Sequence, residues 1–175
     1  MPAWCSTAAP CTDMTRHLFL TGPKGVGKST LIRDCLARET GRLGGFFTVK
    51  QQGSVYLLRA GTGEAPDAEN FLFRCGCGGD PGRFDALGCA ALADTEGRSL
   101  LVMDELGPHE AQAVRFQAAV FRALEGKIPI LGVLQQADSD FLRRIAGHPR
   151  VTVLTVTEDN RGSLGAELLR WREER

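Results

Sequence analysis

The sequence predicts an α/β fold with a mostly parallel central sheet, helices on both faces of that sheet and an added antiparallel hairpin. Three observations lead to this class. A glycine-rich loop at residues 22–29 joins a short apolar run to a helical pattern. Two β-rich runs at 44–50 and 54–59 flank a glycine-containing turn. Further apolar runs then alternate with helical patterns from residue 84 onward.

The glycine-rich loop at 22–29 has the sequence Gly-Pro-Lys-Gly-Val-Gly-Lys-Ser and fits the phosphate-binding pattern G-x-x-x-x-G-K-[ST]. Its glycines let successive backbone N–H groups point into one anion-sized hollow, Lys28 reaches β- and γ-phosphate oxygens, and Ser29 can ligate magnesium. A buried strand at 17–21 and a helix after the loop supply the context that the motif needs. The loop therefore predicts a bound nucleoside triphosphate. The expected contacts are Gly22, Pro23, Lys24, Gly25, Val26, Gly27, Lys28, Ser29 and Thr30.

Composition argues against several other classes. The 21 basic and 21 acidic residues balance, so no net charge favours nucleic acid or an anionic membrane. No apolar run approaches the roughly 20 residues that span a bilayer, and the N-terminus lacks a basic region followed by an apolar one. We expect a flexible tail at 1–13, one domain at 14–175, a monomer and a cytoplasmic location.

The segment after the first helix departs from plain alternation of strands and helices. Its two β-rich runs predict a hairpin added at the sheet edge. Residues 60–83 carry glycine, proline and polar residues without a period, which predicts an irregular segment. It is expected to be either a plain surface loop or a lid that meets phosphate through Arg74 or Arg83.

Three cysteines in and after this segment, Cys75, Cys77 and Cys89, raise the question of a structural metal. Their C-x-C spacing lacks the C-x₂-C spacing of zinc knuckles, and no histidine or fourth cysteine lies nearby in the sequence. We therefore favour a loop without a metal.

The run Leu100–Met103 is apolar and ends in Asp104 and Glu105. This pattern predicts a fully buried parallel strand with carboxylates at its C-terminal tip, where ligands bind in open α/β sheets. Asp104 is placed to hold Mg²⁺, and Glu105 can orient a water on the γ-phosphate. We expect Lys28 and Glu105 to be catalytic, and Ser29 and Asp104 to be the metal ligands.

The rest of the chain continues the alternation. Helices are expected at 84–95, 110–125, 139–146 and 162–171, with buried strands at 128–134 and 151–156. Gln135 ends the first of these strands and either senses the γ-phosphate or is a surface group. Asn160 and Arg161 follow the second strand, so we expect them to contact the base or the ribose.

These motifs together resemble the small nucleoside-triphosphatases of the thermophile type, a family that includes the cancer-related nucleoside-triphosphatase. The resemblance covers roughly residues 17–170. It is carried by the loop at 22–29, Gly45-Phe46-Phe47-Thr48, Asp104-Glu105-Leu106-Gly107 with Glu110, and Asn160-Arg161. The resemblance implies a three-layer P-loop core with an extra central strand and a catalytic glutamate. It also implies slow, magnesium-dependent hydrolysis of several nucleoside triphosphates to diphosphate and phosphate.

Two departures from the family pattern stand out. His109 replaces the usual Met and is either a proton relay or, more simply, a surface histidine. Residues 54–57 read Ser-Val-Tyr-Leu where the family tends to carry Arg and Gly-Phe, which weakens any expectation of a phosphate-contacting arginine in the hairpin.

Three functions stay open at this point: a nucleoside-triphosphatase, a kinase for a small acceptor, and a nucleotide-gated binding protein. A kinase needs an acceptor pocket and an arginine-bearing lid, for which residues 74–83 are the candidates. Glu105 favours hydrolysis, because a water-activating carboxylate beside Asp104 would waste nucleotide in a kinase.

Overall fold

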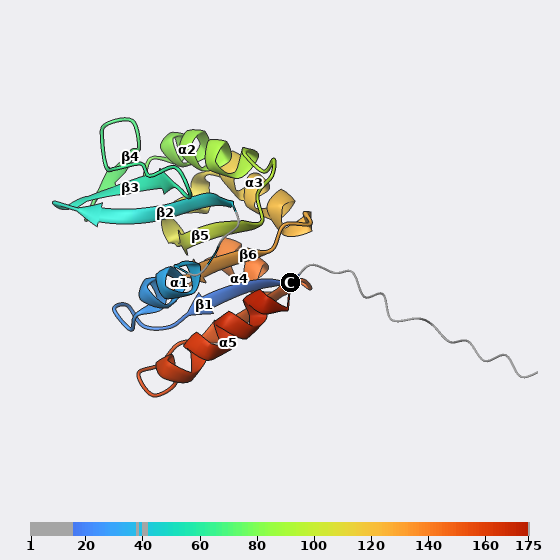
Figure 1. The fold of residues 1–175 in the computed structure, drawn as a ribbon. Helices are drawn as coiled ribbons and strands as arrows, with labels where there is room; N and C mark the ends of the chain where they lie inside the picture. The colour runs from blue at the N-terminus through green and yellow to red at the C-terminus, as the bar shows by residue number, and fades with distance from the viewer. Residues whose placement is uncertain (1–15, 38, 40–41, 175) are drawn as a thin grey trace, which may run out of the picture.

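The computed structural model describes residues 16–37, 39 and 42–174, which form a seven-stranded sheet between two layers of helices (Figure 1). The elements in chain order are β1 His17–Thr21, α1 Lys28–Leu36, β2 Leu43–Gln51, β3 Ser54–Arg59, β4 Phe71–Arg74, α2 Pro81–Ala93, β5 Leu100–Leu106, the 3₁₀ helix η1 Pro108–Gln112, α3 Val114–Glu125, β6 Ile130–Leu134, α4 Asp140–Ala146, β7 Val151–Thr155 and α5 Arg161–Glu173. The tail expected at 1–13 lies outside the described residues.

The sheet has the strand order β4-β3-β2-β5-β6-β1-β7. From β2 to β7 all neighbouring strands are parallel, whereas β3 and β4 are antiparallel additions. The strand β6 lies between β1, which precedes the phosphate-binding loop, and β5, which carries the two acids. The mostly parallel sheet and the extra central strand are therefore confirmed.

The two helical layers follow from the alternation of side chains along each strand. Leu101 and Met103 of β5 pack into a core with α2, α3 and α4, while Leu100 and Val102 pack into a second core with α1 and α5. Each helix buries an apolar face against one of these cores. The predicted three-layer arrangement is therefore confirmed (Figure 1).

The predicted hairpin is confirmed as β2 and β3, but its place in the sheet is not at the edge. Its first strand pairs in parallel with β5, and residues 71–74 form a further strand, β4, that makes the edge. The expectation of an irregular segment at 60–83 is thus partly wrong, because α2 also begins earlier, at Pro81. The guanidinium of Arg83 donates to the carbonyl oxygens of Ala68, Glu69 and Phe71, which organises this segment and takes Arg83 away from any role as a phosphate-binding lid residue.

Gly45 permits the contact between β2 and β5 that builds one wall of the site. Its φ is +82°, and a Cβ at this position would lie 2.0 Å from the carbonyl oxygen of Val102. The close approach sets the register in which Phe47 pairs with Asp104. Thr48 is thereby brought beside the end of β5.

His17 at the start of β1 is fully buried and contacts the C-terminal end of α3. Its Nε2 lies 2.9 Å from the carbonyl oxygen of Leu124, and its Nδ1 has no hydrogen-bond partner among the described residues. Burial lowers the pKa of His17 below its ordinary value of 6.5, and the nearby His148 and Arg150 charges lower it further. The hydrogen bond with Leu124 and the Glu125 carboxylate oppose the shift.

We predict that His17 makes the protein less stable in acid. Above pH 6.5 His17 takes nothing from the free energy of unfolding. As the pH falls from 6.5 toward the lowered pKa, the free energy of unfolding decreases, because there the unfolded chain binds a proton that the folded chain does not. In denaturant titrations, the free energy of unfolding of His17→Gln should fall less across this pH range than that of wild type. The exposed His109→Gln serves as the control, and an unchanged pH dependence in His17→Gln would contradict the prediction.

Candidate functional site

The phosphate-binding loop lies between β1 and α1, at the carboxyl edge of the parallel strands. Gly22, Gly25 and Gly27 have φ values of +140°, +83° and +104°, which L side chains rarely adopt. The backbone can therefore wrap around an anion, and α1 begins directly after Gly27, so that its positive end faces the same hollow.

Lys28 is buried at the base of this loop, with 8% of its surface exposed. Its ammonium donates to the carbonyl oxygens of Gly22 and Pro23, each at 2.8 Å. These contacts hold the charge inside the loop. A phosphate bound there would offer anionic oxygens, which form stronger charge-assisted hydrogen bonds than carbonyls do.

Ser29 and Asp104, the two expected metal ligands, are joined directly. The Ser29 hydroxyl donates to Oδ1 of Asp104 at 3.0 Å, and Asp104 is only 2% exposed. Burial raises the pKa of Asp104 to about 6, although the hydrogen bond from Ser29 opposes the shift. A hydroxyl beside a buried carboxylate is a donor pair of hard oxygens, which fits Mg²⁺.

The described residues contain no cluster of three or more His, Cys, Asp or Glu side chains arranged to hold a metal. Two protein ligands are nevertheless enough for Mg²⁺, because this ion usually keeps water and phosphate oxygens in its shell.

Glu105 is half-buried in the same cavity, and two neighbours fix its position. Its Oε1 accepts a hydrogen bond from Nε2 of Gln135 at 2.5 Å, and its backbone N–H donates to Oγ1 of Thr48 at 3.2 Å. Gln135, either a sensor or a surface group by its sequence position, thus touches the expected catalytic carboxylate. Sequence reasoning did not identify Thr48 as a site residue, although it ends the Gly-Phe-Phe-Thr run that carries part of the family resemblance.

Glu110 also lines this cavity, with 4% of its surface exposed, and was not among the expected site residues. Its Oε2 accepts a hydrogen bond from the N–H of Gly107 at 3.0 Å, which closes the turn after β5. Burial raises the pKa of Glu110 to about 8, and the Glu105 charge adds to the rise, while the backbone hydrogen bonds oppose it. At neutral pH its carboxyl group is therefore mostly protonated and can donate as well as accept.

The turn after β7 lies beside the phosphate-binding loop. The Cδ atom of Arg161 is 3.1 Å from the position that a Cβ on Gly27 would take, so the Arg161 side chain lies against the loop. The Asn160 amide accepts from the N–H of Thr157 and donates to the carbonyl oxygen of Thr155, each at 2.8 Å. Arg161 therefore has an exposed guanidinium beside the loop, whereas Asn160 holds the turn in shape.

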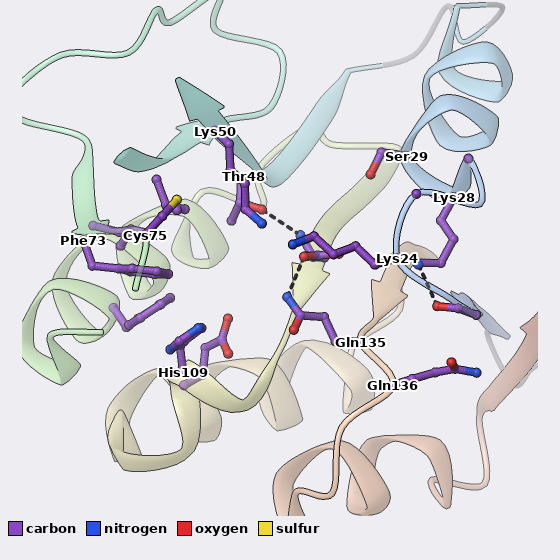
Figure 2. Close-up of a pocket in the computed structure, with 18 of the residues that line it drawn as sticks. Lys24, Lys28, Ser29, Thr48, Lys50, Phe73, Cys75, His109, Gln135 and Gln136 are labelled. Carbon is purple, nitrogen blue, oxygen red and sulfur yellow. Dashed lines mark hydrogen bonds between the residues drawn. The ribbon is translucent and has the colours of Figure 1, made fainter. Parts of the chain in front are cut away.

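Most of the phosphate-binding loop lines one cavity of about 770 Å³ together with Glu105, Glu110 and Gln135, whereas Asp104, Asn160 and Arg161 lie outside its lining (Figure 2). Lys24, Lys28 and Ser29 lie at one end, Phe73, Cys75 and His109 lie at the other, and Thr48, Lys50 and Gln135 lie between them. His109 is exposed and its ring packs on Phe73, with 4.6 Å between the ring centroids. The volume is within the range of small-molecule sites, roughly 300–1,000 Å³.

Comparisons with known proteins identify relatives of this chain. A family model described as NTPase matches residues 80–169. The nucleoside-triphosphatase THEP1 of Thermofilum pendens is 30% identical, over 89% of this chain and 94% of that protein. The cancer-related nucleoside-triphosphatase of Homo sapiens is also 30% identical, over 86% of this chain and 93% of that protein.

Solved structures show the same fold. The crystal structure of THEP1 from Aquifex aeolicus aligns with a TM-score of 0.69 at 18% identity, over 89% of this chain and 97% of that one. The solution structure of a human cancer-related nucleoside triphosphatase aligns with a TM-score of 0.66 at 27% identity, over 91% of this chain and 98% of that one.

We predict that Lys28→Ala weakens binding of a nucleoside triphosphate. The variant loses charge-assisted hydrogen bonds, which are each worth about 1.5–3 kcal/mol. Titration calorimetry with a non-hydrolysable triphosphate should show this loss, while Lys127→Ala, at an exposed lysine away from the cavity, should bind as wild type does. Equal affinity in folded Lys28→Ala would exclude the loop as the phosphate site.

Proposed function

The chain belongs to the NTPase family that includes these nucleoside-triphosphatases, and from this premise we propose that it is a magnesium-dependent phosphohydrolase. Its substrates would be nucleoside triphosphates, ATP and GTP among them, and its products nucleoside diphosphate and phosphate. The observation that carries the proposal is that the loop, Ser29 and the Glu105 carboxylate line one cavity, with Asp104 hydrogen-bonded to Ser29.

Ser29 and Asp104 are the side chains that would hold the magnesium ion. Bound Mg²⁺ would neutralise charge that develops on the phosphate oxygens. The protein supplies Lys28 for the same purpose, from a buried position where its charge is weakly screened.

Glu105 is the group that we assign to the attacking water. Phosphoanhydride hydrolysis needs a water held in line with the leaving oxygen and little covalent chemistry from the protein. The hydrogen bond from Gln135 occupies one carboxylate oxygen and fixes the direction of the other. The carboxylate can then accept the proton of a water placed on the γ-phosphate.

Arg161 is the residue that we propose for the base or ribose. A guanidinium stacks on the face of any base, which suits an enzyme that accepts several triphosphates. Asn160, whose amide is bonded within the turn, would act by holding Arg161 in place.

We also propose that the protein acts as a cytoplasmic monomer with no nucleic-acid partner, since its charges balance. Within the described part of the chain, none of the helices combines the length and the apolar character needed to cross a bilayer.

The assignment of Glu105 predicts a specific defect in Glu105→Gln. The amide keeps the shape but loses the negative acceptor, so turnover should fall by roughly 10²–10⁴, the usual contribution of a positioned general base. Binding of the triphosphate should survive, because Lys28, Ser29 and Asp104 are unchanged. Phosphate release and nucleotide binding should be measured side by side, with the exposed Glu96→Gln as control. Undiminished phosphate release would remove Glu105 from the mechanism.

The Ser29–Asp104 pair predicts a strict need for a hard divalent cation. Chelation by EDTA should abolish phosphate release and added Mg²⁺ should restore it. Ser29→Ala should raise the magnesium concentration at half-maximal rate, since it removes one ligand. Full activity in EDTA, or dependence on zinc that Cys75→Ser and Cys77→Ser abolish, would contradict this assignment.

The position of Arg161 predicts that Arg161→Ala raises KM for purine and pyrimidine triphosphates alike, since stacking does not read base edges. Steady-state kinetics with ATP, GTP, CTP and UTP measure this directly. Arg170→Ala, on the exposed surface of the same helix, is the matched control. KM values that stay at the wild-type level for all four substrates would rule out this contact.

A further inference from the structure

The end of the cavity farthest from the phosphate-binding loop forms an aromatic recess, lined by Val55, Leu72, Phe73, Phe84 and His109, with Cys75 at its rim. Figure 2 shows Phe73, Cys75 and His109 across Thr48 and Gln135 from the loop residues. The recess opens into the same cavity as Glu105.

The recess has an apolar wall. Val55 and Leu72 are 4% and 1% exposed, and the Phe73 centroid lies 6.0 Å from that of Phe84 and 4.6 Å from that of His109. A Cβ at Gly79 would lie 2.8 Å from the Phe84 ring, so glycine lets the segment before α2 close over this wall. An aromatic ring of a ligand can pack on such a surface, because aromatic rings pack against one another at similar centroid distances.

Polar groups lie between the aromatic recess and the phosphate-binding loop. Glu105 and the buried Glu110 line the same cavity, and Figure 2 shows Lys50 between the recess and the loop residues. The Glu105 carboxylate favours a neutral ligand over an anionic one, and a ligand hydroxyl can donate to it. Hydrolysis requires only a water molecule beside the γ-phosphate, so it gives the aromatic recess no role.

We propose that the aromatic recess is an acceptor subsite, which lets this chain transfer the γ-phosphoryl group to a hydroxyl-bearing aromatic small molecule. The acceptor ring lies against Phe73 and His109, and its hydroxyl points to Glu105. This inference rests on the proposed function, because it uses the same bound triphosphate and the same carboxylate.

The transfer balances without a further reactant. The acceptor oxygen forms a bond to the γ-phosphorus as the bond from that phosphorus to the β–γ bridging oxygen breaks. The hydroxyl proton passes to the Glu105 carboxylate and then to solvent. The products are a phosphate monoester and the nucleoside diphosphate, and water competes with the acceptor for the same phosphoryl group.

The test supplies the full chain with Mg²⁺, ATP labelled at the γ-phosphate, and benzyl alcohol, 2-phenylethanol or phenol as probes. Diphosphate, free phosphate and labelled ester are measured together, with toluene as the probe that lacks a hydroxyl. Cys75→Trp should block the rim of the recess, whereas the matched Cys77→Trp changes an exposed cysteine that does not line the cavity.

Wild type and Cys77→Trp should form ester with at least one alcohol and none with toluene, so that diphosphate exceeds free phosphate. Cys75→Trp should form about tenfold less ester and release phosphate at the wild-type rate without alcohol. Three outcomes would overturn the acceptor subsite while leaving the hydrolase intact. These are equal amounts of diphosphate and free phosphate with every alcohol, inhibition by an alcohol without ester formation, and an equal loss of ester in both tryptophan variants. Absence of diphosphate formation without any alcohol would instead overturn the hydrolase.

Discussion

The hydrogen bond from Ser29 to Asp104 is the contact on which the site depends. Asp104 is almost fully buried, and an isolated carboxylate there would be costly, so the hydroxyl at the start of α1 compensates its burial. The same contact joins the phosphate-binding loop to the end of β5 across the intervening strand β6. The loop, the two proposed metal ligands and the proposed catalytic carboxylate consequently form one unit.

The insertion of β6 has a second consequence. Because its C-terminal end lies between those of β1 and β5, Gln135 reaches Glu105. The Gln135 amide in turn lies against Gly107, where a Cβ would be 2.8 Å from it. Gly107 also donates to the buried Glu110 carboxyl. The turn after β5 and the tip of β6 therefore hold the Glu105 carboxylate from two sides, which limits its freedom before any ligand binds.

The antiparallel strands β3 and β4 widen the site beyond the needs of phosphate binding. They extend the sheet past β2, and α2 packs over their inner face. This arrangement carries Val55, Leu72 and Phe73 to the same cavity as the phosphate-binding loop. A plain parallel core would end at β2, so the apolar part of the cavity exists because of the added strands.

The sequence alone determined the residues whose chemistry is local: the glycines and lysine of the phosphate-binding loop, the apolar strand that ends in Asp104 and Glu105, and the hairpin. Each of these patterns depends on the residues next to it along the chain. The strand β4, the contacts of Gln135 and Thr48 with Glu105, and the use of Arg83 to brace a loop were decided only by the tertiary structure. Gln135 and Thr48 lie 30 and 57 positions from Glu105, and strand order and register alone bring them together. Because sheet pairing joins residues that are distant in sequence, no local sequence pattern predicts such partners.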